Sequence, residues 1–154
     1  MFFNELDFGQ QGHLGFDEPG LDGAIAKAFF TALLLTKSPQ RAEAAVAESI
    51  DYLNPEEPFE EAVLRGAVCA AIYASAGALP PNQQEEEAAL AALPRQLRGV
   101  LGFTPNLRRC FVLRILLQLP REVCVRILHL TMKEIDQYTC EALWSLINLF
   151  HGQM

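Results

Sequence analysis

Prolines divide this sequence into short segments whose apolar residues are spaced as in helices. Six of the nine prolines stand at the start or end of these segments, at positions 39, 55, 80, 81, 94 and 120. Proline lacks a backbone N–H and has a fixed φ angle, so it begins or ends a helix but rarely continues one. The aliphatic residues are mostly Leu and Ala, which favour helices over strands. The sequence therefore predicts an all-α fold.

The predicted helices follow from apolar residues recurring three and four positions apart. Ser38 is placed to cap one of them, with Pro39 at its first position. The run from Val63 to Ala74 is almost wholly apolar, which is typical of a helix at the centre of a bundle. The predicted helices cover residues 21–36, 39–52, 59–76, 85–93, 94–101, 106–117, 120–128 and 132–150.

The clearest linker lies at residues 77–84, where Pro80 and Pro81 interrupt the helical spacing. It separates two small helical modules, at residues 21–76 and 93–150, with the linker and a short acidic helix at 77–92 between them. Residues 1–20 are predicted to be a loosely ordered N-terminal arm, whose Phe8 and Phe16 could dock onto the body. The arm lacks the pattern of a signal peptide, and no apolar run approaches a membrane span, so we expect a cytoplasmic protein without membrane contact.

The net charge of −7 is unevenly distributed. Residues 1–92 carry 4 basic and 15 acidic side chains, whereas residues 93–154 carry 8 basic and 4 acidic ones. Affinity for nucleic acid rests largely on Lys and Arg displacing counterions. The first half is therefore unsuited to binding DNA unaided, and the second half is suited only modestly.

The cysteines, histidines and carboxylates do not predict an active site. Cys69, Cys110, Cys124 and Cys140 lie in apolar runs without a CxxC pair, and we expect buried free thiols. A zinc site of Cys124, His129 and Cys140 is the alternative, but it lacks an established ligand spacing. The three histidines are distant from any evident nucleophile, and the glutamate runs are typical of solvated faces. We expect no metal, no cofactor and no enzymatic activity.

The most informative stretch, residues 120–135, predicts two helices joined by a tight turn. His129 and Leu130 form the turn, while Thr131 and Glu134 have the spacing of a capping box. Two short helices joined in this way are the signature of a helix-turn-helix. An ordinary helical hairpin in a bundle fits the same pattern equally well.

Residues 107–146 resemble the C-terminal promoter-reading region of bacterial RNA polymerase sigma factors, particularly the extracytoplasmic-function type. The parallels are the Arg108–Arg109 pair, the Phe-Val-Leu-Arg run at 111–114, the turn at 127–131 and the helix from Met132. Residues 32–36, 42–50 and 59–73 are similar to the other conserved module of the family, in the same order. The resemblance covers about residues 21–148 and implies a sigma-region-2-like module followed by a sigma-region-4-like helix-turn-helix.

The departures from the family fall on its polar contact positions. Asp136, Tyr138 and Glu141 stand where the recognition helix of the family is usually basic, and Lys133 is the only cation on this helix. In the segment that resembles the promoter-melting helix, Arg65 is the one polar family position that remains. Val68, Cys69 and Tyr73 stand where the family has polar residues. In the helix that family members press against the polymerase, Ala45 and Ala47 replace polar residues, although Glu43 and Glu48 remain. The resemblance thus implies that the apolar scaffold of the family is retained, whereas the polar residues that make its contacts are replaced.

The resemblance implies a sigma-factor-like transcription regulator with weakened or lost promoter binding. The alternative is a protein-interaction module on a sigma scaffold that binds polymerase, an anti-sigma-like partner or itself, so homo-oligomers stay open. Core packing is the simpler expectation for Trp144 and Phe150, and a solvated face for each arginine. The candidate DNA contacts, if binding is retained, are Arg108, Arg109, Arg114, Arg121, Arg126, Thr131, Lys133 and Gln137. The candidate partner contacts are Glu43, Glu48, Tyr138 and Trp144.

Overall fold

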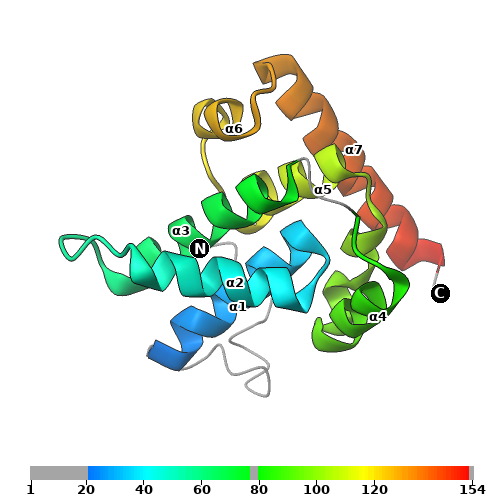
Figure 1. The fold of residues 1–154 in the computed structure, drawn as a ribbon. Helices are drawn as coiled ribbons and strands as arrows, with labels where there is room; N and C mark the ends of the chain where they lie inside the picture. Colours follow the sequence, from blue (N-terminus) through cyan, green and yellow to red (C-terminus); the bar gives the residue numbers. More distant parts are fainter. Residues whose placement is uncertain (1–20, 77–79, 153–154) are drawn as a thin grey trace.

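The computed structural model describes the backbone of residues 21–76 and 80–152, and this part of the chain consists of helices with no strand. The predicted all-α fold is confirmed. Figure 1 shows the helices in chain order from blue to red. Their bounds are α1 Leu21–Thr36, α2 Pro39–Asp51, α3 Phe59–Ser75, α4 Gln83–Ala92, the 3₁₀ helix η2 Arg95–Gly102, α5 Pro105–Cys110, the π-helix η3 Phe111–Leu116, α6 Arg121–Leu128 and α7 Met132–Gly152.

Helices α1, α2 and α3 pack together through small and aliphatic side chains. Leu33, Leu34 and Leu35 of α1 are fully buried, and α2 buries two of its four alanines, Ala42 and Ala45. The approach of α3 to α2 is closest at Gly66, where an added Cβ would lie 2.8 Å from the Cβ of Ser49. A glycine at this position therefore allows two helix backbones to come closer than side chains would permit.

The turn between α1 and α2 forms as the sequence predicts. Lys37 ends α1 in the left-handed conformation, with φ of 60°. The hydroxyl of Ser38 then accepts a hydrogen bond from the backbone N–H of Arg41 at 3.3 Å, with Pro39 at the first helical position. Side-chain capping and the fixed φ of proline together set where α2 begins.

The segment predicted as a helix at 94–101 is a 3₁₀ helix, η2. The backbone N–H groups of Leu97 and Phe103 each donate to the carbonyl three residues earlier. Gly99 and Gly102 weaken an α-helix here. The buried residues Leu97 and Val100 and the Phe103 that follows are spaced by three, and this spacing brings side chains into line along a 3₁₀ helix.

The prediction of a single α-helix at 106–117 is wrong in one respect, because the helix changes from α to π hydrogen bonding midway. After α5, the chain continues as the π-helical η3, and the N–H of Leu117 donates to the carbonyl of Val112, five residues earlier. The wider turn places Phe111, Val112, Leu113 and Leu116 all in the core. Four buried residues among six exceed the face that a regular α-helix presents, and a π-turn accommodates the excess.

One hydrophobic core runs through both halves of the chain. It contains Leu33–Leu35 of α1 and Val68 of α3 together with Phe111, Leu113 and Ile135 from the second half. A smaller cluster of Ala28, Val46, Val63 and Ala67 lies within α1–α3. The proposed modules at 21–76 and 93–150 therefore pack against each other along a shared interior.

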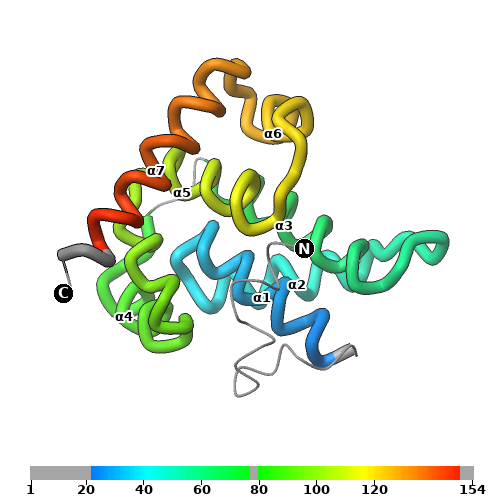
Figure 2. Tube along the Cα trace, turned by 180° about the vertical axis from the view of Figure 1, so that it is seen from behind, coloured from blue at the N-terminus to red at the C-terminus, as the bar shows by residue number. Residues whose placement is uncertain are grey.

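Helix α7 borders the second half. It runs from α6, past α5, to the region of η2 and α4, as both views show (Figures 1 and 2). Near its C-terminal end, Leu149 approaches Gly99 of η2 so closely that a Cβ there would lie 2.7 Å from Leu149 Cδ1. In the described part of the chain, no helix has both the length and the apolar character needed to cross a membrane.

Candidate nucleic-acid and partner interface

The α6–α7 unit forms the predicted tight turn and capping box. His129 ends α6 with φ of 57°, in the left-handed region. The N–H of Glu134 donates to Thr131 Oγ1 at 3.1 Å, and the N–H of Thr131 donates to Glu134 Oε1 at 3.0 Å. These reciprocal bonds satisfy two backbone donors at the start of α7. The buried Cys124 and Ile135 hold the two helices to the core.

Arg108 does not lie on an outer face, contrary to its place among the candidate DNA contacts. Only 6% of the residue is exposed, and its Nη1 donates to the carbonyl oxygen of Phe103 at 3.1 Å. Burial, followed by the nearby charge of Arg109, lowers the pKa of Arg108 to about 10. A guanidinium withdrawn from solvent in this way has no open side for a phosphate. The physical reason is that α5 packs against both α1 and α7, and Arg108 lies on its buried side.

Arg109 and Arg114 also form hydrogen bonds within the protein. Arg109 Nη2 donates to Ser75 Oγ of α3 at 3.3 Å, joining the two halves. Arg114 Nη1 donates to the carbonyl oxygen of Leu119 at 2.8 Å and holds the loop before α6. Both side chains are partly buried, and their Nε atoms have no hydrogen-bond partner within the part of the chain that the structure describes. The arginine cluster predicted for DNA is therefore used mainly inside the fold.

The remaining DNA candidates are exposed on α6, on α7 or in the turn between them. Thr131, Lys133 and Gln137 are exposed, as are Arg121 and Arg126. However, Arg121 Nη1 donates to Asp136 Oδ2 at 2.8 Å in an ion pair across the two helices. Together α6 and α7 carry three cations, Arg121, Arg126 and Lys133, against four carboxylates, Glu122, Glu134, Asp136 and Glu141. The face is slightly negative.

Of the aromatic partner candidates, Tyr138 is tied to the body and Trp144 is free. Tyr138 packs against the core, and its hydroxyl accepts a long hydrogen bond of 3.5 Å from Asn106 Nδ2. Trp144 is 67% exposed, so the simpler expectation of core packing is wrong for it. The side chain of Phe150 lies outside the described residues. Leu143 and Ile147, which sequence reasoning missed, are also exposed and flank Trp144 on α7, so the three form an apolar patch. Their positions one residue before and three residues after Trp144 are the signal that could have identified this patch.

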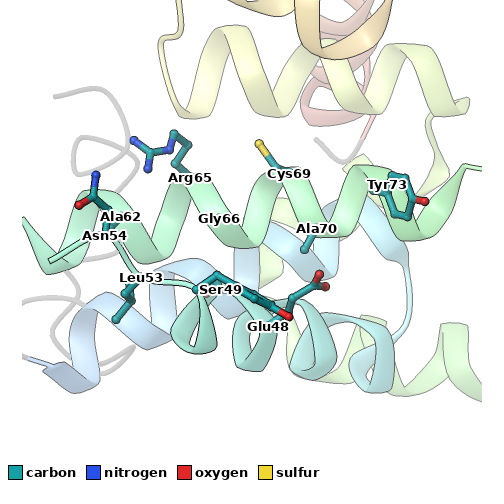
Figure 3. Close-up of a pocket in the computed structure, with 11 residues that line it drawn as sticks. Glu48, Ser49, Leu53, Asn54, Ala62, Arg65, Gly66, Cys69, Ala70 and Tyr73 are labelled. Atoms are coloured by element: carbon teal, nitrogen blue, oxygen red, sulfur yellow. The ribbon is translucent and has the colours of Figure 1, made fainter. Parts of the chain in front are cut away.

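Glu43 and Glu48 are both exposed on α2. Glu48 lines a pocket of about 360 Å³ between α2 and α3, together with Ser49, Tyr52, Arg65 and Tyr73 (Figure 3). Arg65 is held by Glu57, to which both of its terminal nitrogens donate. This hydrogen bond keeps the pKa of the Glu57 carboxyl below its usual value. The pocket is therefore mixed in character, with an acidic and aromatic rim.

The cysteines differ from their prediction. Cys110 and Cys124 are buried free thiols, and burial raises the pKa of Cys110 to about 12. Cys69 and Cys140 are exposed, which contradicts the expectation for these two. Both lie on faces whose burial depends on tertiary packing, which an apolar run alone does not reveal. Among the described residues, no group of three or more His, Cys, Asp and Glu side chains is placed to hold a metal ion.

Some predictions fall on residues beyond this description. The loosely ordered arm at 1–20, the docking of Phe8 and Phe16, and the first part of the linker at 77–79 lie outside the described residues. Comparison with known proteins gives no matching family model, and no curated protein or solved structure matches the chain.

Proposed function

We propose that this protein is a sigma-factor-like transcription regulator with weakened or lost promoter DNA binding, which acts in the cytoplasm through protein contacts. One observation carries the proposal. The α6–α7 unit has the turn and capping of a DNA-reading unit, whereas its outer face holds more carboxylates than cations and an internal Arg121–Asp136 pair.

The charge balance argues against tight duplex binding. Each phosphate neutralised by Lys or Arg releases counterions, and this release supplies most of the affinity for DNA irrespective of its sequence. Arg108, Arg109 and Arg114 are engaged inside the fold. Only Arg126 and Lys133 of the candidate cations remain exposed without an ion pair among the described residues. Two cations beside four carboxylates make a poor phosphate surface.

The exposed side chains support protein contacts instead. Trp144 with Leu143 and Ile147 forms an apolar patch, and such patches commonly mark interaction sites. Glu43 and Glu48 are further exposed carboxylates, on α2. By the sigma resemblance, α2 would meet the polymerase core, and the α7 patch would serve a second partner.

The second candidate is an interaction module with no DNA role, which binds polymerase, an anti-sigma-like protein or itself. The exposed Trp144 favours it, because tryptophan is enriched among the residues that dominate interface energies. The two candidates differ in whether the protein keeps a role at promoter DNA.

A binding assay on labelled duplex DNA tests the first part of the proposal. We expect weak, non-specific binding that disappears between about 50 and 200 mM salt. The double variant Asp136→Arg/Glu141→Arg should bind more tightly and with a steeper salt dependence, because it restores cations to the α7 face. Asp51→Arg/Glu56→Arg makes the same charge change at exposed positions far along the chain and is the control. Tight salt-resistant binding by the unmodified protein would contradict the proposal.

Binding to purified bacterial polymerase core tests the second part. We expect the protein to bind and to compete with an authentic sigma factor. Glu43→Lys/Glu48→Lys should weaken this binding, whereas Glu56→Lys/Glu87→Lys, an equal charge change on exposed residues, should not. If no binding to the core occurs, the regulator proposal fails and the second candidate takes its place.

A further inference from the structure

A groove of about 500 Å³ separates α3 from α6. Its walls are mostly apolar and come from both halves of the chain. Figure 3 shows the side chains of Arg65 and Cys69 directed away from α2, and both line this groove as well as the pocket between α2 and α3. The apolar residues lining it are Leu64, Val68, Leu117, Leu119, Val123 and Ile127.

The rim of the groove carries charges of both signs, because Glu61 lines it from α3 and Arg126 lines it from α6. Arg126 lines the groove from α6, is exposed and forms no ion pair among the described residues. Arg65, on the opposite side, is already bound to Glu57. An occupant that combines apolar side chains with carboxylates would therefore fit, since it would fill the apolar walls and pair with Arg126.

The chain itself contains a segment of this chemistry. Residues 1–20 contain four of the ten phenylalanines, carry four acidic residues and have no Lys or Arg. The densest part is residues 2–8, Phe-Phe-Asn-Glu-Leu-Asp-Phe, in which Glu5 and Asp7 alternate with Leu6 and Phe8. Each buried aromatic ring would remove a large apolar area from water.

The length of this segment permits it to reach the groove. Twelve residues, 9–20, would link the docked segment to α1, and a flexible linker of that length has a root-mean-square span of roughly 19 Å. Extended, it would reach about 40 Å. Being tethered, the segment would also be present at an effective concentration in the millimolar range, which favours it over a free competitor.

We propose that the acidic, aromatic segment at residues 2–8 docks in the groove between α3 and α6 of its own chain. It would then cover the junction of the two halves and occupy the surface that another apolar partner would otherwise use. The proposal is independent of whether the protein binds DNA or polymerase.

The two exposed cysteines provide a test in the full-length protein. Cys69 lines the groove, whereas Cys140 lies on α7 and does not. Both are alkylated with N-ethylmaleimide, and each rate is measured by peptide mapping. The triple variant Phe2→Ser/Phe3→Ser/Phe8→Ser should raise the alkylation rate at Cys69 by about tenfold or more, because the tethered segment would no longer cover the groove. The alkylation rate at Cys140 should stay unchanged. Gln10→Ser/Gln11→Ser, in the same arm, is the control and should change neither rate.

A second measurement identifies the occupant. Under mild oxidation, the thiol introduced by Asn4→Cys should form an intramolecular disulfide with Cys69 in preference to Cys140. Arg126→Glu should reduce this preference. Equal rates at Cys69 in the unmodified and phenylalanine-free proteins would overturn the proposal. Protection of Cys69 that increases with protein concentration would also overturn it, because it would assign the groove to a second copy of the chain.

Discussion

Helices α2 and α3 and helices α6 and α7 form two consecutive pairs that are held together in different ways. The first pair relies on small residues, and Gly66 lets the α3 backbone lie against Ser49. The second pair relies on a left-handed turn at His129, a capping box and a few buried side chains such as Cys124 and Ile135. Close packing fixes the first pair along its length, whereas the second is fixed mainly at its turn and its core side.

The difference explains where the open surfaces lie. Around α6 the chain leaves a groove against α3 and a free outer face, and both carry the residues of functional interest. A unit anchored at one side can present its other side to partners without loss of packing. The following predictions, from the largest effect to the smallest, test whether the two regions depend on their anchors as described.

Phe111→Ala should have the largest effect. Phe111 is fully buried in the core shared by both halves and meets Phe103 edge to face at a centroid distance of 6.1 Å. The cavity should lower the free energy of unfolding by about 4 kcal/mol. Urea unfolding is followed by far-UV circular dichroism for the whole chain and by fluorescence of Trp144 for the second half. Because the core is continuous, both signals should shift together, and two separated transitions would show that the halves are independent.

Gly66→Val tests the close approach of α2 and α3. The new side chain would overlap Ser49 and should lower the free energy of unfolding by about 2 kcal/mol, despite a better helix propensity. Gly102→Val is the matched control, because nothing lies within 4 Å of a Cβ at that position. Equal effects of the two substitutions in chemical denaturation would refute the role of small residues in the first pair.

His129→Gly should stabilise the protein. A side chain with a Cβ is strained at φ of 57°, and glycine removes this strain for a gain of about 1 kcal/mol. Lys37→Gly, at the equivalent turn after α1, should gain less, because Lys37 also pairs with Glu86 at 3.2 Å. Thermal unfolding measures both variants. A loss of stability for His129→Gly would mean that the imidazole makes a contact that outweighs the strain.

Asp136→Asn should have the smallest effect on stability. The ion pair with Arg121 joins α6 to α7, but both side chains are about half exposed, at 46% and 48%. Solvent screens such pairs, so the loss should be about 0.5 kcal/mol or less and should disappear at high salt. Denaturation at two salt concentrations checks this. A larger, salt-independent loss would show that the pair, and not the turn, holds the second unit together.

Much of the fold could be predicted from local sequence. The starts of α1, α2, α3 and α7 agree with the prediction, because proline, Ser38 and Thr131 act through neighbours a few residues away. The winding of η2 and η3 could not be predicted, since it depends on which side chains the rest of the protein buries. The glutamates on α2 were expected at the surface as partner contacts and are exposed there.

The candidate site was predicted less well, and the arginines show why. Arg108, Arg109 and Arg121 read alike in the sequence, yet one is buried, one binds Ser75 of α3 and one pairs with Asp136. The groove between α3 and α6 left no trace in the sequence, because its walls come from two segments, 61–69 and 117–127, that lie far apart along the chain.

The sequence by itself determined the helices, the turn at His129 and the excess of carboxylates on α6 and α7, because each depends on residue type and near neighbours. Only the tertiary structure decided which cations reach solvent, which cysteines are exposed and that a single core joins the halves. Those properties depend on distant parts of the chain meeting, and burial is set by what packs against a side chain, not by the side chain alone.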